Sequence, residues 1–169
     1  RVFNLMDEMD EYVNDGELEV EHLKGDVEFR YVTFGYDEGV TVLEDVSFCA
    51  KEGKTIAIVG PTGSGKTTII NLMNRFYDID QGSILIDDIE INQYKKDQLR
   101  KKIGVVLQDT KLFAGTVYDN IVYGNHAAAQ EEIEHAATLA NAHDFIMRLP
   151  KGYQSEVHEG GQNFSHGER

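Results

Sequence analysis

The chain has 169 residues, a formal net charge of −14 and a hydrophobic content of 41%. Its length allows one domain with a hydrophobic core. The acidity argues against a nucleic-acid-binding surface, which needs clustered Lys and Arg, but it does not exclude a nucleotide, which needs only local positive charge. No apolar run approaches the roughly 20 residues that span a bilayer. Cys49 is the only cysteine, which excludes an internal disulfide and favours a reducing compartment.

The first 25 residues are acidic, and we interpret them as a linker. Residues 1–11 carry apolar side chains at helical spacing, which predicts a short helix, and Asn14-Asp15-Gly16 predicts a turn. Acidic residues are dense between Asp7 and Glu21. Such a run is typical of a solvated surface.

Further elements follow in chain order. Residues 26–34 and 40–50 are rich in Val, Phe, Tyr and Thr and are predicted as strands. Short apolar runs predict strands at 54–59, where burial on both faces is expected, and at 82–87 and 103–107. Helices are predicted over 96–102, from Thr116 onward with a capping box, and over 127–141 with an apolar stripe.

Residues 60–68 match the phosphate-binding pattern G-x-x-x-x-G-K-[ST] and lie between a predicted strand and a predicted helix. Backbone N–H groups of such a loop, with a helix dipole behind them, suit a polyphosphate. Lys66 is expected to reach the outer phosphates and the Thr67 hydroxyl to bind Mg²⁺. The expected phosphate-binding residues are Gly60, Pro61, Thr62, Gly63, Ser64, Gly65, Lys66, Thr67 and Thr68.

The apolar run 83–86 ends in Asp87-Asp88, which leaves two interpretations open. Asp87 would orient magnesium in a small self-contained kinase or GTPase. Alternatively, the two acids occupy the turn of a hairpin. The local pattern does not separate these alternatives.

From about residue 26 onward the chain resembles the nucleotide-binding domain of ATP-binding cassette transporters of the exporter type. The resemblance rests on several motifs in order: VTFGY, VLEDVSF, IAIVGPTGSGKTT, NLMNRFYD, GSILIDD, LRKKIGVVLQDTKLFAGTVYDNIVYG, AHDFIMRLPKGY and FSHGER. It implies an α/β fold, with a P-loop NTPase core, an antiparallel β-subdomain and the start of an α-helical subdomain. The implied division is a linker at 1–25, the β-subdomain and core at 26–106, and the Q-loop with a partial helical subdomain at 107–169.

The resemblance also implies roles for individual residues. Tyr36 corresponds to the aromatic residue that stacks on adenine, for which a flat π-face is suited. Gln108 corresponds to the glutamine that completes the Mg²⁺ shell, so Lys66 and Gln108 are the expected catalytic residues and ATP with Mg²⁺ the expected cofactors. The segment 109–120 would meet a membrane domain, and Glu159 would lie in an acidic loop ahead of the signature motif.

Residues 164–169 correspond to the signature motif, in which Ser165, Gly167 and Glu168 would contact the ATP of a second domain. His166 and Glu168 depart from the usual LSGGQ form. This departure suggests a heterodimer with unequal ATP sites. Ser165-x-x-Glu168 is also a capping-box pattern, which predicts a helix from Ser165.

The resemblance implies a head-to-tail dimer that couples ATP hydrolysis to export, at the cytoplasmic face of a membrane and attached to a membrane domain. The chain contains neither the family's strand ending in Asp-Glu after the signature nor its switch histidine. We therefore expect these 169 residues to bind ATP but to hydrolyse it slowly or not at all. A nucleotide-binding module that hydrolyses nothing is the alternative.

Overall fold

The computed structural model describes Val13 and residues 15–37, 39–107, 111–165 and 167–168. The chain forms two compact units, Arg1–Val105 (the N-terminal unit) and Val106–Arg169 (the C-terminal unit). The helix predicted over 1–11 lies outside the described residues.

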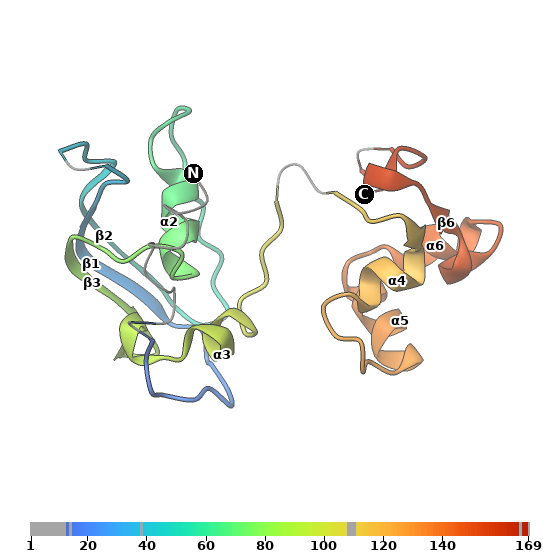
Figure 1. Ribbon diagram of the computed structural model, residues 1–169, viewed down its shortest axis with the longest axis horizontal. Helices are drawn as coiled ribbons and strands as arrows, with labels where there is room; N and C mark the ends of the chain where they lie inside the picture. Colours follow the sequence, from blue (N-terminus) through green and yellow to red (C-terminus); the bar gives the residue numbers. More distant parts are fainter. Residues whose placement is uncertain (1–12, 14, 38, 108–110, 166, 169) are drawn as a thin grey trace, which may run out of the picture. The chain divides into compact units, whose positions relative to one another are not determined.

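The N-terminal unit contains an antiparallel sheet with the strand order β2-β1-β3-β4 (Figure 1). The strands are β1 (Val27–Phe34), β2 (Leu43–Ala50), β3 (Gln81–Ile86) and β4 (Ile89–Glu90). The first three agree with the strands predicted at 26–34, 40–50 and 82–87. In β1, the buried side chains are Phe29, Val32 and Phe34.

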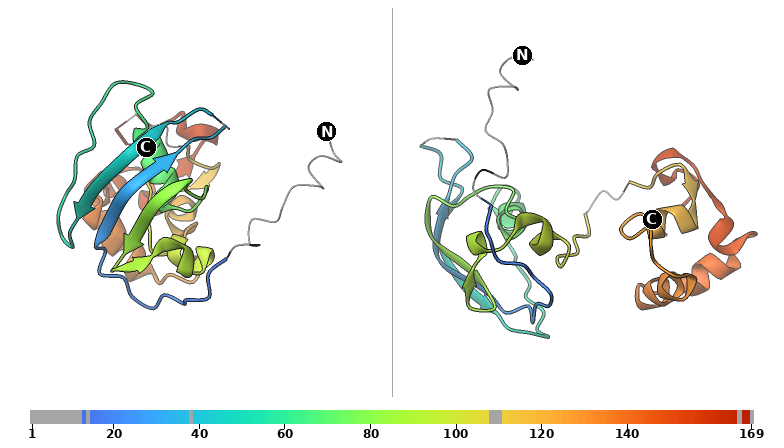
Figure 2. Two further views of the ribbon diagram at one scale, coloured as in Figure 1. Left: turned by 90° about the vertical axis from the view of Figure 1, so that its left-hand side faces the viewer. Right: turned by 60° about the horizontal axis from the view of Figure 1, so that its bottom comes forward.

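Helix α2 (Lys66–Met73) lies on one side of this sheet (Figure 1, Figure 2). It buries Ile69 and Leu72 in a core that includes Phe29 and Ile84 of the sheet. The 3₁₀ helix η1 (Ile91–Gln93) and helix α3 (Lys96–Arg100) follow β4. Leu99 of α3 joins the same core, as the prediction of a helix over 96–102 requires.

The acidic segment at 15–25 packs against this unit. Leu18 exchanges backbone hydrogen bonds of 2.9 Å with Gln93 and Lys95. Val20 is buried, whereas the side chains of Glu17, Glu19 and Glu21 are exposed. The acids therefore lie in solvent, as the sequence indicates, but the backbone that carries them is held by the domain.

The strands predicted at 54–59 and 103–107 are wrong for the described structure. Neither segment is paired in a sheet, and Ile56, Val59 and Val106 are 47%, 88% and 95% exposed. A strand forms only where neighbouring strands satisfy its backbone N–H and C=O groups. No described segment provides that neighbour, so neither run forms a strand, and only Ile103 of the two runs packs against the core.

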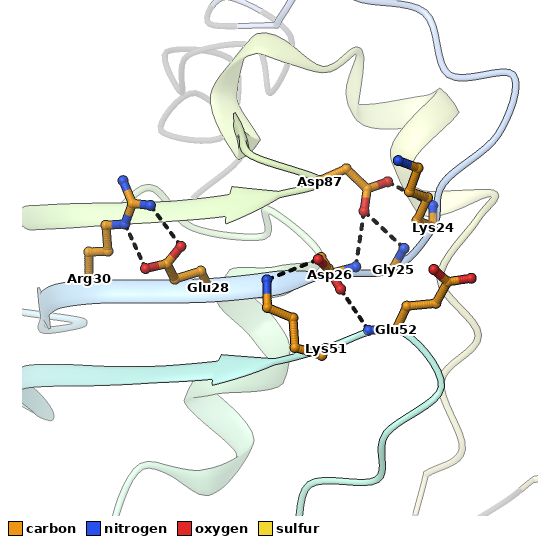
Figure 3. A network of polar contacts seen from close by, with 8 residues as sticks. All are labelled: Lys24, Gly25, Asp26, Glu28, Arg30, Lys51, Glu52 and Asp87. Atoms are coloured by element: carbon orange, nitrogen blue, oxygen red, sulfur yellow. Dashed lines mark hydrogen bonds and ion pairs between the residues drawn. The ribbon is translucent and has the colours of Figure 1, made fainter.

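Asp87 lies in the hairpin turn between β3 and β4, and its carboxylate accepts hydrogen bonds from backbone amides (Figure 3). Its carboxylate accepts hydrogen bonds from the N–H groups of Lys24 (2.7 Å), Gly25 (3.0 Å) and Asp26 (3.0 Å). This geometry favours the turn over the magnesium-binding interpretation, because both carboxylate oxygens already have donors.

Asp26 continues this network to the residues that follow β2 (Figure 3). Its carboxylate accepts hydrogen bonds from the Glu52 N–H at 2.6 Å and from Lys51 Nζ at 3.0 Å. The amide of Glu52 and, next, the ammonium of Lys51 lower the pKa of the Asp26 carboxyl below its usual value. Two carboxylates thus join the entry of β1 to the end of β2 and to the β3–β4 turn.

The C-terminal unit is mainly helical (Figure 1). It consists of a two-stranded ribbon of β5 (Gly115–Thr116) and β6 (Glu156–Val157), the helices α4 (Val117–Val122), α5 (Gln130–Leu139) and α6 (His143–Arg148), and the 3₁₀ helices η2 (Gly152–Gln154) and η3 (Glu159–Gly161).

Two of its helices, α4 and α5, form where the sequence predicts them, whereas α6 was not predicted. The capping box at the start of α4 is present, because the Thr116 hydroxyl accepts from the Asp119 N–H at 3.0 Å and the Asp119 carboxylate accepts from the Thr116 N–H at 2.9 Å. Ile133 and Ala137 of α5 supply the buried stripe predicted over 127–141 and pack with Ile146 of α6. Local sequence signals therefore account for α4 and α5, but not for α6, the 3₁₀ helices or the β5–β6 ribbon.

Asp87→Ala tests the amide contacts of the turn. We expect it to lower the free energy of unfolding by about 1–2 kcal/mol more than Asp88→Ala, because only Asp87 accepts the three amide hydrogen bonds. Asp88 is a matched control, since both residues have positive φ (53° and 65°) and both variants carry the same kind of backbone strain. Urea unfolding of both variants measures the difference. Equal losses would contradict the role given to Asp87.

Candidate functional site: the phosphate loop and its aromatic neighbour

The phosphate loop at 60–68 lies in the N-terminal unit and leads directly into α2. Gly65 takes the left-handed conformation, with φ at 82°, immediately before the helix. The Gly65 carbonyl accepts the first helical hydrogen bond from Ile69 at 3.1 Å, and Ser64 N–H donates to the Pro61 carbonyl at 3.2 Å. The turn that the glycine pattern predicts is therefore formed, and a helix N-terminus follows it.

Close packing surrounds one glycine of the loop. A Cβ atom at Gly65 would lie 2.5 Å from Cδ2 of the buried Leu43, whereas one at Gly60 would meet the hydroxyl of the exposed Ser64 at 2.6 Å, which can rotate away. Gly65 is buried, whereas the loop before it is exposed to solvent. The base of the loop is therefore packed against β2 while its outer part is open to a ligand.

Lys66 extends along the loop. Its Nζ donates to the carbonyl oxygens of Gly60 at 2.8 Å and Pro61 at 2.6 Å. The Ser64 hydroxyl lies 3.4 Å away. The ammonium is thus held against the backbone of the loop, and phosphate oxygens could replace these carbonyls as its acceptors.

The two threonines in the first turn of α2 differ in their exposure to solvent. Thr67 is exposed and Thr68 is buried. An exposed Thr67 hydroxyl is available to a metal ion at the loop. Among the described residues, no cluster of His, Cys, Asp or Glu could hold a metal on its own, so a Mg²⁺ here would depend on phosphate oxygens for most of its ligands.

Tyr36 lies beside the phosphate loop, although 23 residues separate it from Gly60 in the sequence. Its hydroxyl donates to Thr68 Oγ1 at 3.1 Å. Its ring makes edge contacts with the rings of Phe34 and Tyr77, each with a centroid distance of 5.0 Å. The side chain is 44% exposed, so part of the ring remains free for stacking.

A hollow of about 380 Å³ adjoins Tyr36. This volume is within the range of small-molecule pockets. The loop after β1 forms its wall, and that loop is tied to the sheet because Gly35 N–H donates to Asp80 Oδ2 at 3.0 Å. The remaining lining residues are Asp37, Gly39, Val40 and Thr41.

The predicted signature residues lie in the C-terminal unit, and Ser165, Gly167 and Glu168 are all exposed. Ser165 N–H donates to Glu168 Oε2 at 2.8 Å, which is one half of the expected capping box. Hydrogen bonds from the side chain and amide of Ser165 lower the pKa of Glu168. These residues form a turn; the helix predicted from Ser165 is not seen, because the described residues there are too few for a helical turn.

The segment before the signature is anchored within the same unit. Asn163 Nδ2 donates to the Glu156 carbonyl at 2.8 Å, and Phe164 packs edge-on against Phe145 of α6, with centroids 5.8 Å apart. Glu159 opens η3 and is exposed. The structure thus presents Ser165 on a supported loop. Two residues that the sequence analysis singled out, Gln108 for the Mg²⁺ shell and His166 in the signature motif, lie outside the described residues.

Comparison with known proteins identifies relatives along the whole chain. The model of the ABC transporter family matches residues 43–169. A fatty acid ABC transporter ATP-binding/permease protein of Mycobacterium bovis is 47% identical over 169 residues, which cover 100% of this chain and 27% of that protein. An uncharacterized ABC transporter ATP-binding protein of Bacillus subtilis is 45% identical over 170 residues, which cover 100% of this chain and 28% of that protein.

A solved structure of a bacterial Atm1-family ABC exporter with ATP bound matches with a TM-score of 0.85 and 43% identity. The match covers 98% of this chain and 29% of that one. The chain therefore spans well under a third of the length of these relatives. In the ranges that the structure describes, none of the helices has the length and apolar character of a membrane span.

Gly65→Ala tests the packing at the base of the loop. We expect it to destabilise the chain more than Gly63→Ala, by about 1–3 kcal/mol, because its Cβ would overlap Leu43 whereas a Cβ at Gly63 meets nothing within 4 Å. The two glycines have similar φ angles (82° and 84°), so the backbone strain is matched. Thermal or urea unfolding measures the difference. Equal destabilisation would show that the Leu43 side chain moves aside without loss of stability.

Proposed function

Because the chain belongs to the ABC transporter family, we propose that it binds ATP with Mg²⁺ and that, in the intact protein, ATP binding and hydrolysis drive export of a solute. The relatives that support export are ATP-binding/permease proteins and an exporter of solved structure. The transported solute is left open, since the residues that select it would lie in the membrane domain.

One observation carries this proposal. In the N-terminal unit a phosphate-binding loop leads into α2, and a half-exposed tyrosine ring lies against the same helix, joined to it by the 3.1 Å hydrogen bond between Tyr36 and Thr68. A nucleoside triphosphate has a polyanion at one end and a flat aromatic base at the other, and each end suits one of these two features. Lys66 and the amides of the loop suit the first end, and the Tyr36 ring suits the second.

We propose the same division of roles that the sequence indicates. Lys66 contacts the outer phosphates, Thr67 and Gln108 complete the Mg²⁺ shell, and Tyr36 stacks on adenine. Ser165, Gly167 and Glu168 contact the ATP of a second nucleotide-binding domain in a head-to-tail dimer. The segment after Gln108 meets a membrane domain and places the chain at the cytoplasmic face of that membrane.

The alternatives differ in what the site does with nucleotide. A small kinase or GTPase would use Asp87 on magnesium, but that carboxylate accepts three backbone amides instead. A module that binds ATP without hydrolysing it is the other alternative, and release of phosphate distinguishes it from an ATPase. We propose that the 169-residue chain binds ATP and hydrolyses it slowly.

Lys66→Ala tests ATP binding. We expect titration calorimetry with Mg²⁺ to give an affinity for ATP weaker by about 10–100-fold, because hydrogen bonds between ammonium and phosphate are lost. Lys54→Ala is the control, since Lys54 is an exposed lysine of the same unit. Unchanged affinity in Lys66→Ala would contradict the proposal. Phosphate release that depends on Lys66 would exclude the alternative of binding without hydrolysis.

Tyr36→Trp tests base stacking. The chain contains no tryptophan, so this variant has a single indole fluorophore. We expect Mg-ATP to change its emission, because the base stacks on the ring, and Mg-tripolyphosphate to change it little. Tyr31→Trp serves as the control, since Tyr31 is 70% exposed and is not among the residues that line the hollow beside Tyr36. Equal responses at both positions would contradict stacking at residue 36.

A further inference from the structure

A short chain of hydrogen bonds holds the Tyr36 hydroxyl from two positions on α2. Asn71 Nδ2 donates to the Tyr36 hydroxyl at 3.2 Å, and this hydroxyl donates to Thr68 Oγ1 at 3.1 Å. Thr68 is 4% exposed and Asn71 is half-buried. Residues 68 and 71 are separated by three positions and therefore lie on one face of the helix.

The ring of Tyr36 is also confined at its edges. Phe34 and Tyr77 meet it at interplanar angles of 84° and 85°. These edge contacts oppose rotation of the ring about its long axis, but they leave the far end of the side chain free to swing about χ1. The two hydrogen bonds hold the hydroxyl oxygen in place and so restrain that swing. Asn71 supplies one of them and belongs to no part of the phosphate-binding pattern.

We propose that Asn71 is a positioning residue for the nucleobase: by holding the Tyr36 hydroxyl, it keeps the ring oriented beside its hollow before nucleotide arrives. This inference rests on the proposed function, because it assumes that Tyr36 receives the base. It assigns a role to the tyrosine hydroxyl, which is not needed for stacking itself. Phenylalanine at position 36 would keep the π-face but lose both hydrogen bonds.

The physical gain is preorganisation. A side chain that is 44% exposed would otherwise lose rotational freedom when the base stacks on it, and that loss weakens binding. Restraint of one such side chain corresponds to a change in affinity of about two- to tenfold. The contact also couples the two ends of the nucleotide site, because Thr68 follows the proposed metal ligand Thr67 on the same helix.

The test compares a ligand that has a base with one that has none. Calorimetry with Mg²⁺ gives the affinities of the chain for ATP and for inorganic tripolyphosphate. In Asn71→Ala we expect ATP affinity to fall about two- to tenfold and tripolyphosphate affinity to stay constant. Asn71→Leu, which keeps the side-chain volume, gives a second measurement. Asn92→Ala is the matched control, because Asn92 is an exposed asparagine of the same unit and has no hydrogen bond to Tyr36.

A double-mutant cycle with Tyr36→Phe isolates the hydroxyl. Tyr36→Phe should lower ATP affinity at least as much as Asn71→Ala, and Asn71→Ala should have no further effect in the Tyr36→Phe background. Additive losses would overturn the proposal. So would equal losses for ATP and tripolyphosphate in Asn71→Ala, because they would indicate a general disturbance of α2.

The outcomes also separate this inference from the proposed function. If Lys66→Ala weakens binding of both ligands but the ratio of their affinities is unchanged in Asn71→Ala, nucleotide binding stands and the positioning role fails. If Lys66→Ala changes neither affinity, the proposed function itself fails.

Discussion

The close contact between Gly65 and Leu43 is the constraint on which the candidate site depends. It brings the start of α2 onto β2 and leaves no room for a side chain, while the outer loop stays open. The aromatic group of Phe34, Tyr36 and Tyr77 joins the end of β1 to the segment that follows α2. Both parts of the proposed ATP site are thereby fixed to one sheet. A ligand meets a surface whose backbone is already in place, which reduces the entropy lost on binding.

The acidity of the chain has a structural use within the described residues. Several carboxylates accept hydrogen bonds from backbone amides: Asp87 from the segment before β1, Asp80 from Gly35, Asp119 at the start of α4 and Glu168 at the signature turn. Amide contacts require no basic partner, so they are compatible with a net charge of −14. They also fix turns and helix starts, where backbone N–H groups would otherwise lack acceptors.

Local sequence patterns predicted the parts of this fold that local chemistry determines. The glycine pattern at 60–68, the Val, Phe, Tyr and Thr content of 26–34 and the capping box at Thr116 each specify geometry within a few residues. The strands predicted at 54–59 and 103–107 failed because burial depends on a neighbouring layer, which composition does not report. The contacts from Asn71 to Tyr36 and from Asp80 to Gly35 were not predicted, since each joins residues 35 to 45 positions apart without a motif. Gln108 and His166 keep their predicted roles as proposals.

The attachment of the segment at 15–25 has a mechanical consequence. Leu18 is paired with Gln93 and Lys95, and the amides at 24–26 are held by Asp87. Tension applied to the chain ahead of residue 15 would be carried first by Asp15, which accepts a 2.7 Å hydrogen bond from the Lys96 N–H at the start of α3 and lies 3.8 Å from Arg75, and then by η1 and the β3–β4 turn. Through Arg75 the pull would reach α2 at its C-terminal end, whereas the phosphate loop precedes the other end of that helix.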